Sequence, residues 1–205
     1  MRLQAAFDDV TGERCLEIVE NCYEDLDIIE TGTLLIINEG LSPLKKLREL
    51  YPKAKLLADP KIMDAPEKIA RKCYEAGADI VTVMTVSGEK VMKKVIDAAK
   101  EYGKEVFADL LHSKEPLKDA ILADSLGADY ICVHSSTEDS KDALYEIRSI
   151  KAVVRHAKIA VAGGIRPETA DRFKGSGADI VIAGSSITTA KDPKEAVRLL
   201  KEKIK

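Results

Sequence analysis

Short apolar runs rich in β-branched residues recur along this chain at a nearly constant interval. Eight of them can be read, at residues 3–7, 28–31, 55–59, 80–83, 105–109, 130–134, 158–162 and 180–183. Successive runs begin 22 to 28 residues apart, which is the length of one strand, one helix and two short loops. The tripeptide Gly-Ala-Asp, starting at Gly77, Gly127 and Gly177, repeats every 50 residues and is typical of a helix end that leads into a strand. The sequence therefore predicts eight successive βα units.

Eight βα units within 205 residues favour one fold class. We predict an α/β protein, a single (β/α)8 TIM barrel over residues 1–205, with no linker and no second domain. A doubly wound open sheet is the alternative, because eight parallel strands can also remain open. The open sheet usually has a G-x-G-x-x-G loop after its first strand, and none follows residues 3–7. The barrel is therefore the preferred prediction.

Composition limits the partners that this chain can have. Charged residues make up 33% of it, but the net charge is only −3 and no basic cluster stands apart from acidic residues. Nucleic acid requires a basic surface, so we expect no nucleic-acid partner. The sequence has no apolar run of membrane-spanning length and no signal peptide, so we expect a cytoplasmic protein with no membrane partner. The four cysteines include no C-x-x-C pair, which favours buried reduced thiols over a zinc site.

In a TIM barrel the functional residues follow the carboxyl ends of the strands. Acidic residues, one lysine and one histidine occupy these places, namely Asp8, Glu30, Asp59, Lys61, Asp109 and His134. Imidazole exchanges protons near neutral pH, which makes His134 a candidate for proton transfer. His112 and His156 have no strand-end position and are expected to be solvated. The predicted barrel mouth is therefore charged and suited to catalysis.

Two glycine-containing loops, Gly163-Gly164 and Gly184-Ser185, follow the last two predicted strands. Glycines leave backbone N–H groups accessible, and the loops after strands seven and eight of such barrels often bind phosphate. The alternative is that these glycines only form tight turns between strand and helix. We expect a ligand that carries a phosphate.

The segment from Asp59 to Asp64 contains the pattern D-x-K-x-x-D, with Lys61 at its centre. Carboxylates beside an ammonium keep it protonated, and one of them remains available to a metal. Glu30 ends the neighbouring strand, about 4.8 Å from that of Asp59, so the two carboxylates can converge on one cation. Hard oxygen ligands favour Mg²⁺. The alternative is an ion-pair network that only stabilises the rim.

The segments LQAAFD, IETGTLLIINEGL, ADPKIMDA, GADIVTV, DYICVH, AVAGGI and IVIAGSSIT together resemble those of the 3-hexulose-6-phosphate synthases. These enzymes belong to the orotidine 5'-monophosphate decarboxylase suprafamily, and the resemblance covers residues 1–203. It implies an Mg²⁺-dependent aldol lyase that condenses formaldehyde with D-ribulose 5-phosphate to D-arabino-hex-3-ulose 6-phosphate, or catalyses the reverse, through an enediolate. It also implies a homodimer whose active sites lie at the subunit interface.

The resemblance assigns roles to the charged residues. Glu30 and Asp59 would bind Mg²⁺. Lys61 would stabilise the enediolate, with Asp8 supporting the network around it. Asp64 would reach into the active site of the partner subunit.

The resemblance extends to proton transfer and phosphate binding. His134 would take part in proton transfer. The substrate phosphate would be held by Gly163, Gly164, Gly184 and Ser185.

Departures from the family patterns help to separate the alternatives. Pro60 stands where D-x-K-x-x-D usually has another apolar residue. The acidic loop 135–142 lacks the Arg typical of 3-keto-L-gulonate 6-phosphate decarboxylase, and Ser185 replaces that enzyme's phosphate-binding Arg. Both differences favour the synthase over this decarboxylase. A non-catalytic sugar-phosphate-binding barrel is the other alternative, and the complete set of charged rim residues argues against it.

Overall fold

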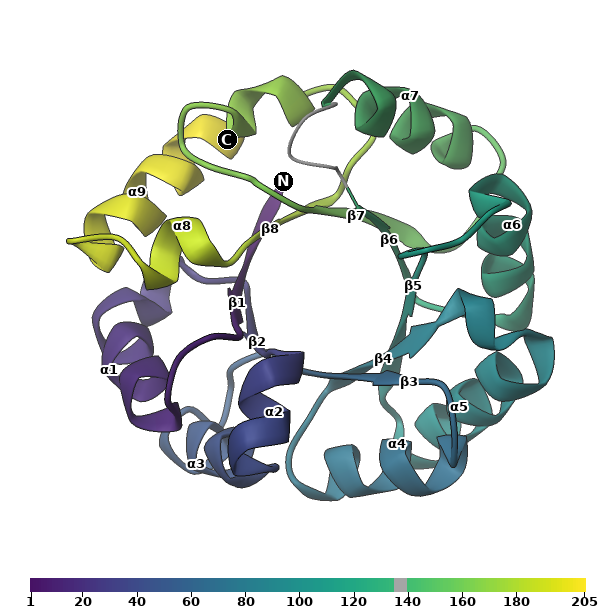
Figure 1. Cartoon of the computed structure of the whole chain (residues 1–205), viewed down its shortest axis with the longest axis horizontal. Helices are drawn as coiled ribbons and strands as arrows, with labels where there is room; N and C mark the ends of the chain where they lie inside the picture. Colours follow the sequence, from purple (N-terminus) through teal and green to yellow (C-terminus); the bar gives the residue numbers. More distant parts are fainter. Residues whose placement is uncertain (135–139) are drawn as a thin grey trace.

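Eight parallel strands form a closed barrel in the computed structural model of this chain, which describes residues 1–134 and 140–205 but not the side chains of 140–142. The strands are β1 (Arg2–Phe7), β2 (Ile28–Thr31), β3 (Leu56–Ile62), β4 (Ile80–Met84), β5 (Glu105–Asp109), β6 (Tyr130–His134), β7 (Lys158–Ala162) and β8 (Ile180–Ala183). Each strand pairs with the next, and β8 pairs with β1 to close the ring (Figure 1). The predicted barrel is confirmed, and the open sheet is excluded.

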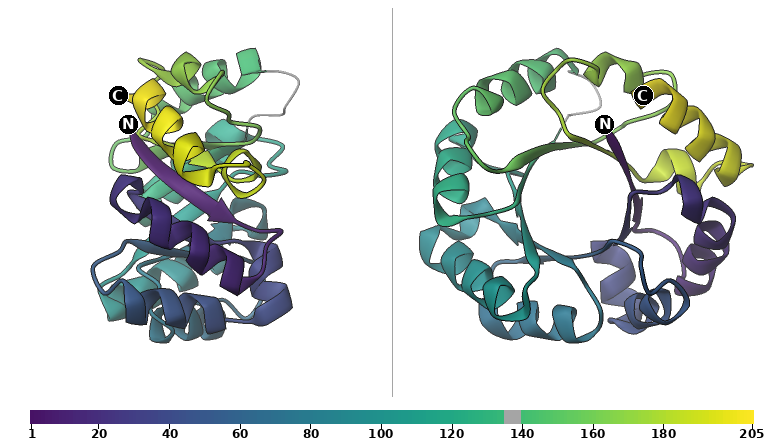
Figure 2. Two further views of the ribbon diagram at one scale, coloured as in Figure 1. Left: turned by 90° about the vertical axis from the view of Figure 1, so that its left-hand side faces the viewer. Right: turned by 180° about the vertical axis from the view of Figure 1, so that it is seen from behind.

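Helices surround the barrel on its outside (Figures 1 and 2). They are α1 (Gly12–Cys22), α2 (Thr33–Glu39), α3 (Ser42–Leu50), α4 (Pro66–Glu75), α5 (Glu89–Tyr102), α6 (Pro116–Leu126), α7 (Ser140–Lys151), α8 (Ser185–Thr188) and α9 (Pro193–Ile204). The prediction of one helix per unit is wrong in three places. The second unit holds both α2 and α3, the eighth holds both α8 and α9, and the seventh holds only a short 3₁₀ helix, Ala170–Phe173. The interval between the β7 and β8 runs is the shortest in the sequence, which leaves little room for a full helix.

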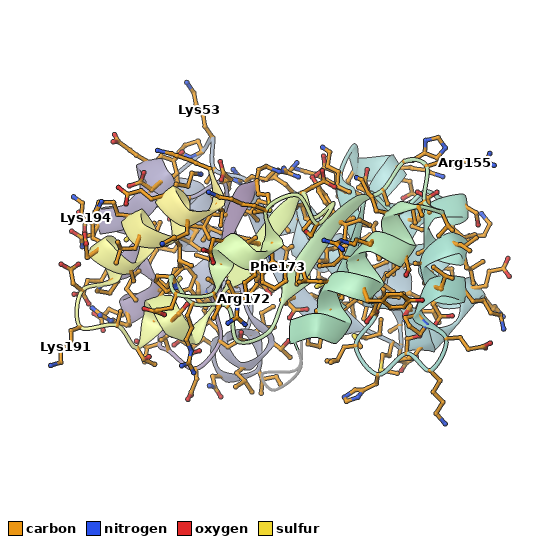
Figure 3. All side chains as sticks on the ribbon, turned by 90° about the horizontal axis from the view of Figure 1, so that it is seen from above. Lys53, Arg155, Arg172, Phe173, Lys191 and Lys194 are labelled. Carbon is orange, nitrogen blue, oxygen red and sulfur yellow. The ribbon has the colours of Figure 1, made fainter. Side chains whose placement is uncertain are left out.

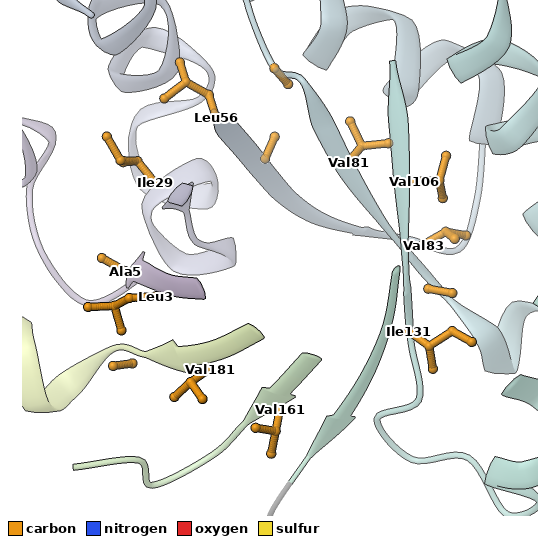
Figure 4. Close-up of a cluster of buried hydrophobic side chains, with 14 of the residues drawn as sticks. Leu3, Ala5, Ile29, Leu56, Val81, Val83, Val106, Ile131, Val161 and Val181 are labelled. Atoms are coloured by element: carbon orange, nitrogen blue, oxygen red, sulfur yellow. The ribbon is translucent and has the colours of Figure 1, made fainter. Parts of the chain in front are cut away.

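Strand residues alternate between two apolar regions, as the pleat of a strand requires. Those that point outward pack under the helices, and Figure 4 shows several of them, including Leu3, Ile29, Val81 and Val161. The inward residues form a second cluster within the barrel, to which Phe107 belongs. This inner cluster closes the barrel below its mouth, so the polar inward residues of the upper strand ends line an open cavity.

The repeated Gly-Ala-Asp tripeptide has two structural roles. Its glycines, Gly77, Gly127 and Gly177, all have positive φ angles between 99° and 108°, as predicted for helix ends. Its aspartates accept a hydrogen bond from the backbone N–H of the preceding strand, as Asp79 does from Leu56 at 3.0 Å and Asp129 from Val106 at 2.8 Å. These carboxylates tie neighbouring strands together at the end of the barrel opposite its mouth.

The buried carboxylate of Asp124 in α6 holds the segment that leads into β7. It accepts the backbone N–H groups of Arg155, His156 and Ala157 at 2.9, 3.0 and 2.7 Å. Burial works to raise the pKa of Asp124, but these three N–H groups and the nearby His156 hold that pKa below its usual value. Asp124 is therefore a tertiary anchor between two consecutive βα units.

The chain termini lie side by side (Figure 2), and the Met1 ammonium donates to the Ile204 carbonyl at 3.3 Å. All four cysteine thiols are free and buried, as predicted. Among the described residues no helix has both the length and the apolar character needed to cross a membrane.

Candidate active site

A cavity of about 250 Å³ opens at the carboxyl ends of the strands. In Figure 3 Lys191, which follows β8, lies toward this end of the molecule, whereas Lys53 and Arg155, which precede strands, project from the other. The cavity is lined by nearly all of the site residues predicted from the sequence: Asp8, Glu30, Asp59, Lys61, His134, Gly163, Gly164, Gly184 and Ser185. The fold thus brings together residues that are up to 177 positions apart in the sequence.

Lys61 reaches the cavity from an irregular part of β3. The pairing of β3 with β4 shifts register between Ala58 and Ile62, and Lys61 within this stretch has a φ of 46°. The Lys61 N–H donates to the Thr82 hydroxyl of β4 at 3.1 Å. Pro60 has no N–H to donate, so it fits a stretch where the regular ladder is interrupted. The unusual proline of this chain is therefore compatible with the local backbone.

The Lys61 ammonium lies between two buried carboxylates. Its Nζ is 2.9 Å from Asp59 Oδ2 and 3.2 Å from Asp109 Oδ2. Partial burial works to lower the pKa of Lys61, but Asp59 and Asp109 raise it above its ordinary value. Lys61 is therefore a fixed positive charge in the cavity at neutral pH, and it cannot serve as a general base there.

Asp109, which ends β5, links Lys61 to the histidine of β6. Asp109 Oδ1 lies 2.8 Å from His134 Nε2 and accepts the N–H of Leu111 at 2.8 Å. Burial works to raise the pKa of Asp109, but His134, Lys61 and the Leu111 N–H together hold it below its usual value. The ionised Asp109 can therefore orient the His134 ring within the cavity.

Glu30 is a further buried carboxylate near Asp59, and these two residues are only 6% and 5% exposed. Burial and the charge of Asp59 raise the pKa of Glu30 well above its ordinary value. Gln4 donates to Glu30 Oε2 at 2.6 Å, and Thr82 donates to Asp59 Oδ1 at 2.5 Å. Asp59 is also paired with the Lys61 ammonium at 2.9 Å. Two buried carboxylates that repel each other are a fitting environment for a hard divalent cation, which would offset their repulsion.

Asp8 lies at the end of β1, close to the backbone of Gly32. A Cβ at residue 32 would be 2.3 Å from Asp8 Oδ1, so the glycine is needed for this approach. Burial and the charge of Asp59 raise the pKa of Asp8, whereas the N–H groups of Leu34 and Thr33 act in the opposite direction. Asp8 therefore lies near enough to Asp59 and Lys61 for the charges of all three groups to be linked.

The glycine loops form another part of the cavity wall. Gly163 and Gly164 have φ angles of 101° and 62°, which glycine adopts readily. Gly184 directly precedes the short helix α8, whose first residue is Ser185. The structure thus places both loops at one mouth, where their backbone and hydroxyl groups can face a ligand.

Asp64 is exposed and lies outside the lining of this cavity. Its predicted place in a partner's active site remains a prediction. The segment 135–139 of the acidic loop after β6 lies outside the described residues, as do the side chains of 140–142. His112 and His156 are exposed, as predicted.

Several lining residues were not predicted as site residues from the sequence. Asp109 was noted at a strand end without a role, and Gln4, Thr82 and Cys132 were not singled out. Each of these three lies one layer below the strand end, on its inward face. A polar residue within an otherwise apolar strand, such as Thr82, is the signal that could have identified them.

A closed barrel with acidic residues around a central lysine defines the class of this protein. The chain belongs to the orotidine 5'-phosphate decarboxylase / HUMPS family, whose model matches residues 1–200. It is 38% identical over its full length to 3-hexulose-6-phosphate synthase of Bacillus subtilis, covering 99% of that protein. The corresponding synthase of Staphylococcus haemolyticus is 36% identical over the same span. These relatives are lyases, and the full-length likeness identifies the chain as an enzyme of that kind.

Solved structures agree with this assignment. The crystal structure of 3-hexulose-6-phosphate synthase from Salmonella typhimurium is 36% identical and superposes with a TM-score of 0.93, covering 100% of this chain and 98% of that one. The 3-keto-L-gulonate-6-phosphate decarboxylase from Vibrio cholerae is 26% identical, with a TM-score of 0.88 and coverage of 99% and 96%. The synthases are therefore the more similar of these two groups in sequence.

Proposed function

We propose that this enzyme condenses formaldehyde with D-ribulose 5-phosphate to give D-arabino-hex-3-ulose 6-phosphate, or catalyses the reverse. The observation that carries the proposal is the position of Lys61 between Asp59 and Asp109 in one cavity with Glu30, His134 and the glycine loops. The reaction removes a proton from C1 of the pentulose and forms a bond from C1 to formaldehyde, whose oxygen then takes up a proton. The site must therefore stabilise an enediolate and exchange a proton.

The acidic side of the cavity suits Mg²⁺ as a cofactor. Glu30 and Asp59 would hold the ion, which would supply a Lewis acid for the carbonyl and neighbouring hydroxyl oxygens of the substrate. The raised pKa of Glu30 supports this assignment, because burial and the charge of Asp59 both disfavour its carboxylate and a nearby cation would favour it.

Lys61 would carry the electrostatic stabilisation. Its ammonium is fixed by two carboxylates before the substrate arrives, so little reorganisation is needed when negative charge develops on the enediolate oxygens. Asp8 would support the position of Lys61, because its carboxyl group interacts electrostatically with both Asp59 and Lys61.

His134 would move the proton. The reaction releases one proton from C1 and returns one to the formaldehyde oxygen, so one exchanging group can serve both steps. Asp109 holds the imidazole at 2.8 Å and would stabilise its charged form between them.

The rest of the substrate would extend toward the glycine loops. Backbone groups of Gly163, Gly164 and Gly184 and the Ser185 hydroxyl would bind the phosphate. Asp64 points to a homodimer with shared sites, because it lies on the surface just three residues after Lys61.

The test is formaldehyde consumption by the purified protein with ribulose 5-phosphate, before and after metal removal. We expect Mg²⁺-dependent turnover that stops in excess EDTA and returns when Mg²⁺ is restored in excess of the chelator. Undiminished turnover after verified metal removal would contradict the role of Glu30 and Asp59. Parallel assay of 3-keto-L-gulonate 6-phosphate decarboxylation should give the slower reaction, and a faster one would favour the decarboxylase instead.

A further inference from the structure

Three potential ligand atoms of different chemistry meet beside Lys61. They belong to Asp109, Cys132 and His134, and all lie within 4.8 Å of one another. Strand register explains the cluster, because Asp109 of β5 is the cross-strand neighbour of Cys132 in β6. His134 follows two residues later and therefore points to the same inner face as Cys132.

The burial of these groups resembles that of a metal site with one open position. Asp109 and Cys132 are only 3% and 2% exposed, whereas the His134 side chain is 28% exposed and borders the cavity. Three protein ligands with the remaining position open to a cavity is the usual arrangement of an accessible zinc ion.

The donor set decides which ions fit. An imidazole nitrogen and a thiolate sulfur suit Zn²⁺ and Co²⁺, whereas Mg²⁺ prefers oxygen ligands such as those of Glu30 and Asp59. Without a metal, burial and the charges of Asp109 and Glu30 raise the pKa of the Cys132 thiol, so it stays protonated. On binding, the thiol would lose its proton to solvent, and two negative ligands would balance the divalent ion.

The positive charge of Lys61 repels a cation at this place, but two contacts of its ammonium reduce the repulsion. Its ammonium contacts Asp109 through Oδ2, at 3.2 Å, whereas Oδ1 is the oxygen that faces His134. Asp59 neutralises the same ammonium at 2.9 Å. Removal of the Lys61 charge should therefore strengthen metal binding.

We infer that Asp109, Cys132 and His134 form a second cation site, selective for borderline-soft divalent ions such as Zn²⁺ and Co²⁺. An ion bound there occupies Asp109 and His134. The proposed aldol reaction uses both side chains, so such an ion inhibits it. This inhibitory consequence rests on the proposed function, whereas the binding site itself does not.

The first experiment measures binding without turnover. Metal-free protein is titrated with Co²⁺ in excess Mg²⁺ and without substrate, and the near-ultraviolet thiolate-to-cobalt band is recorded. We expect a saturable band that Zn²⁺ abolishes and that Cys132→Ser removes. Cys73→Ser, which changes a buried cysteine in α4, is the matched control and should keep the band.

Two further variants test the ligand set in opposite directions. His134→Gln should weaken Co²⁺ binding by at least the ~10-fold typical of lost outer partners. Lys61→Met should tighten it. Thermal melting of each variant verifies that it is folded. The inference would be overturned if the wild type showed no thiolate band, or if the band survived in Cys132→Ser. It would also be overturned if Mg²⁺ displaced the bound Co²⁺ and removed the band.

The second experiment measures inhibition at saturating Mg²⁺. Zn²⁺ should inhibit the wild type, and the concentration for half-inhibition should rise at least ~10-fold in Cys132→Ser when each protein is compared with its own zinc-free rate. Equal zinc sensitivity of the two proteins would refute the inhibitory consequence. A wild type that shows the cobalt band but no synthase turnover would refute the proposed function and leave the cation site standing.

Discussion

Lys61→Met is the substitution that most directly tests the electrostatic account of this site. Methionine keeps a similar length and removes only the charge that lies between Asp59 and Asp109. Because that charge matters most when the enediolate forms, kcat should fall whereas KM for ribulose 5-phosphate should change little.

The size of the loss can be worked out for an enediolate oxygen that lies in direct contact with the Lys61 ammonium. At an effective dielectric of about 20, a unit charge about 3 Å from an ammonium is stabilised by roughly 5–6 kcal/mol, which sets an upper limit near 10⁴-fold in rate. The Lys61 side chain is 30% exposed, so solvent screens part of this energy. We expect a loss of about 10²–10³-fold in kcat, the scale observed for a single preorganised donor.

The matched control is Lys104→Met. Lys104 is also 30% exposed and pairs with an aspartate, Asp79, at 2.7 Å, but it precedes β5 at the far end of the barrel. Steady-state kinetics on both variants, with thermal melting to confirm folding, distinguishes the loss of a charge in the cavity from the loss of a charge elsewhere on the protein. The reasoning fails if Lys61→Met retains kcat within a fewfold of the wild type, or if Lys104→Met loses as much.

Three other predictions concern assembly, phosphate binding and stability. Mixing inactive Lys61→Ala and Asp64→Ala proteins under subunit exchange should restore about a quarter of wild-type activity per site. Half of the dimers are then mixed, and each mixed dimer has one intact site. If tagged chains exchange but no activity returns, Asp64 does not act in the partner's site. Ser185→Ala should raise KM with kcat nearly unchanged in steady-state assays, and a selective fall in kcat would count against a phosphate contact. Asp124→Asn should cost about 3 kcal/mol of unfolding free energy in urea titrations, because the amide cannot accept all three N–H groups. The pKa of Asp124 is lower in the folded than in the unfolded protein, so its carboxylate contributes fully to stability above the unfolded pKa of about 3.9. This contribution is lost as the pH falls toward the folded pKa. The wild type and Asp124→Asn should therefore have similar unfolding free energies at acid pH.

The barrel was predictable because its signal is local and repeated. Each strand is an apolar β-branched run, and the intervals between runs leave room for one helix, so the order and type of elements follow without knowledge of contacts. The observed strands begin and end within three residues of the predicted ones. The replacement of a helix by the 3₁₀ turn Ala170–Phe173 was missed, although the short interval before β8 was visible in the sequence.

Contacts between distant residues were harder to predict. The repeated Asp79 and Asp129 were recognised as parts of helix ends, but their carboxylates bind N–H groups more than 20 residues earlier in the chain. In the same way Asp109 was visible at a strand end, whereas its contacts with both Lys61 and His134 depend on how three strands are arranged around the ring. Residues one layer deeper, such as Cys132, could be predicted as lining residues only by following the alternation of side chains along each strand, below the strand end.

The left-handed backbone at Lys61 sets a local strain against the ion pairs that the same residue makes. A residue with a side chain is held at a φ of 46° there, a conformation that costs about 1–2 kcal/mol for residues other than glycine. Glycine at this position would relax the backbone, but it would also leave the buried Asp59 and Asp109 without the ammonium that pairs with both, which costs about 3–5 kcal/mol. Replacement by glycine should therefore lower the stability of the fold as well as remove the charge on which the proposed chemistry depends, so selection for heat resistance alone should retain lysine at residue 61.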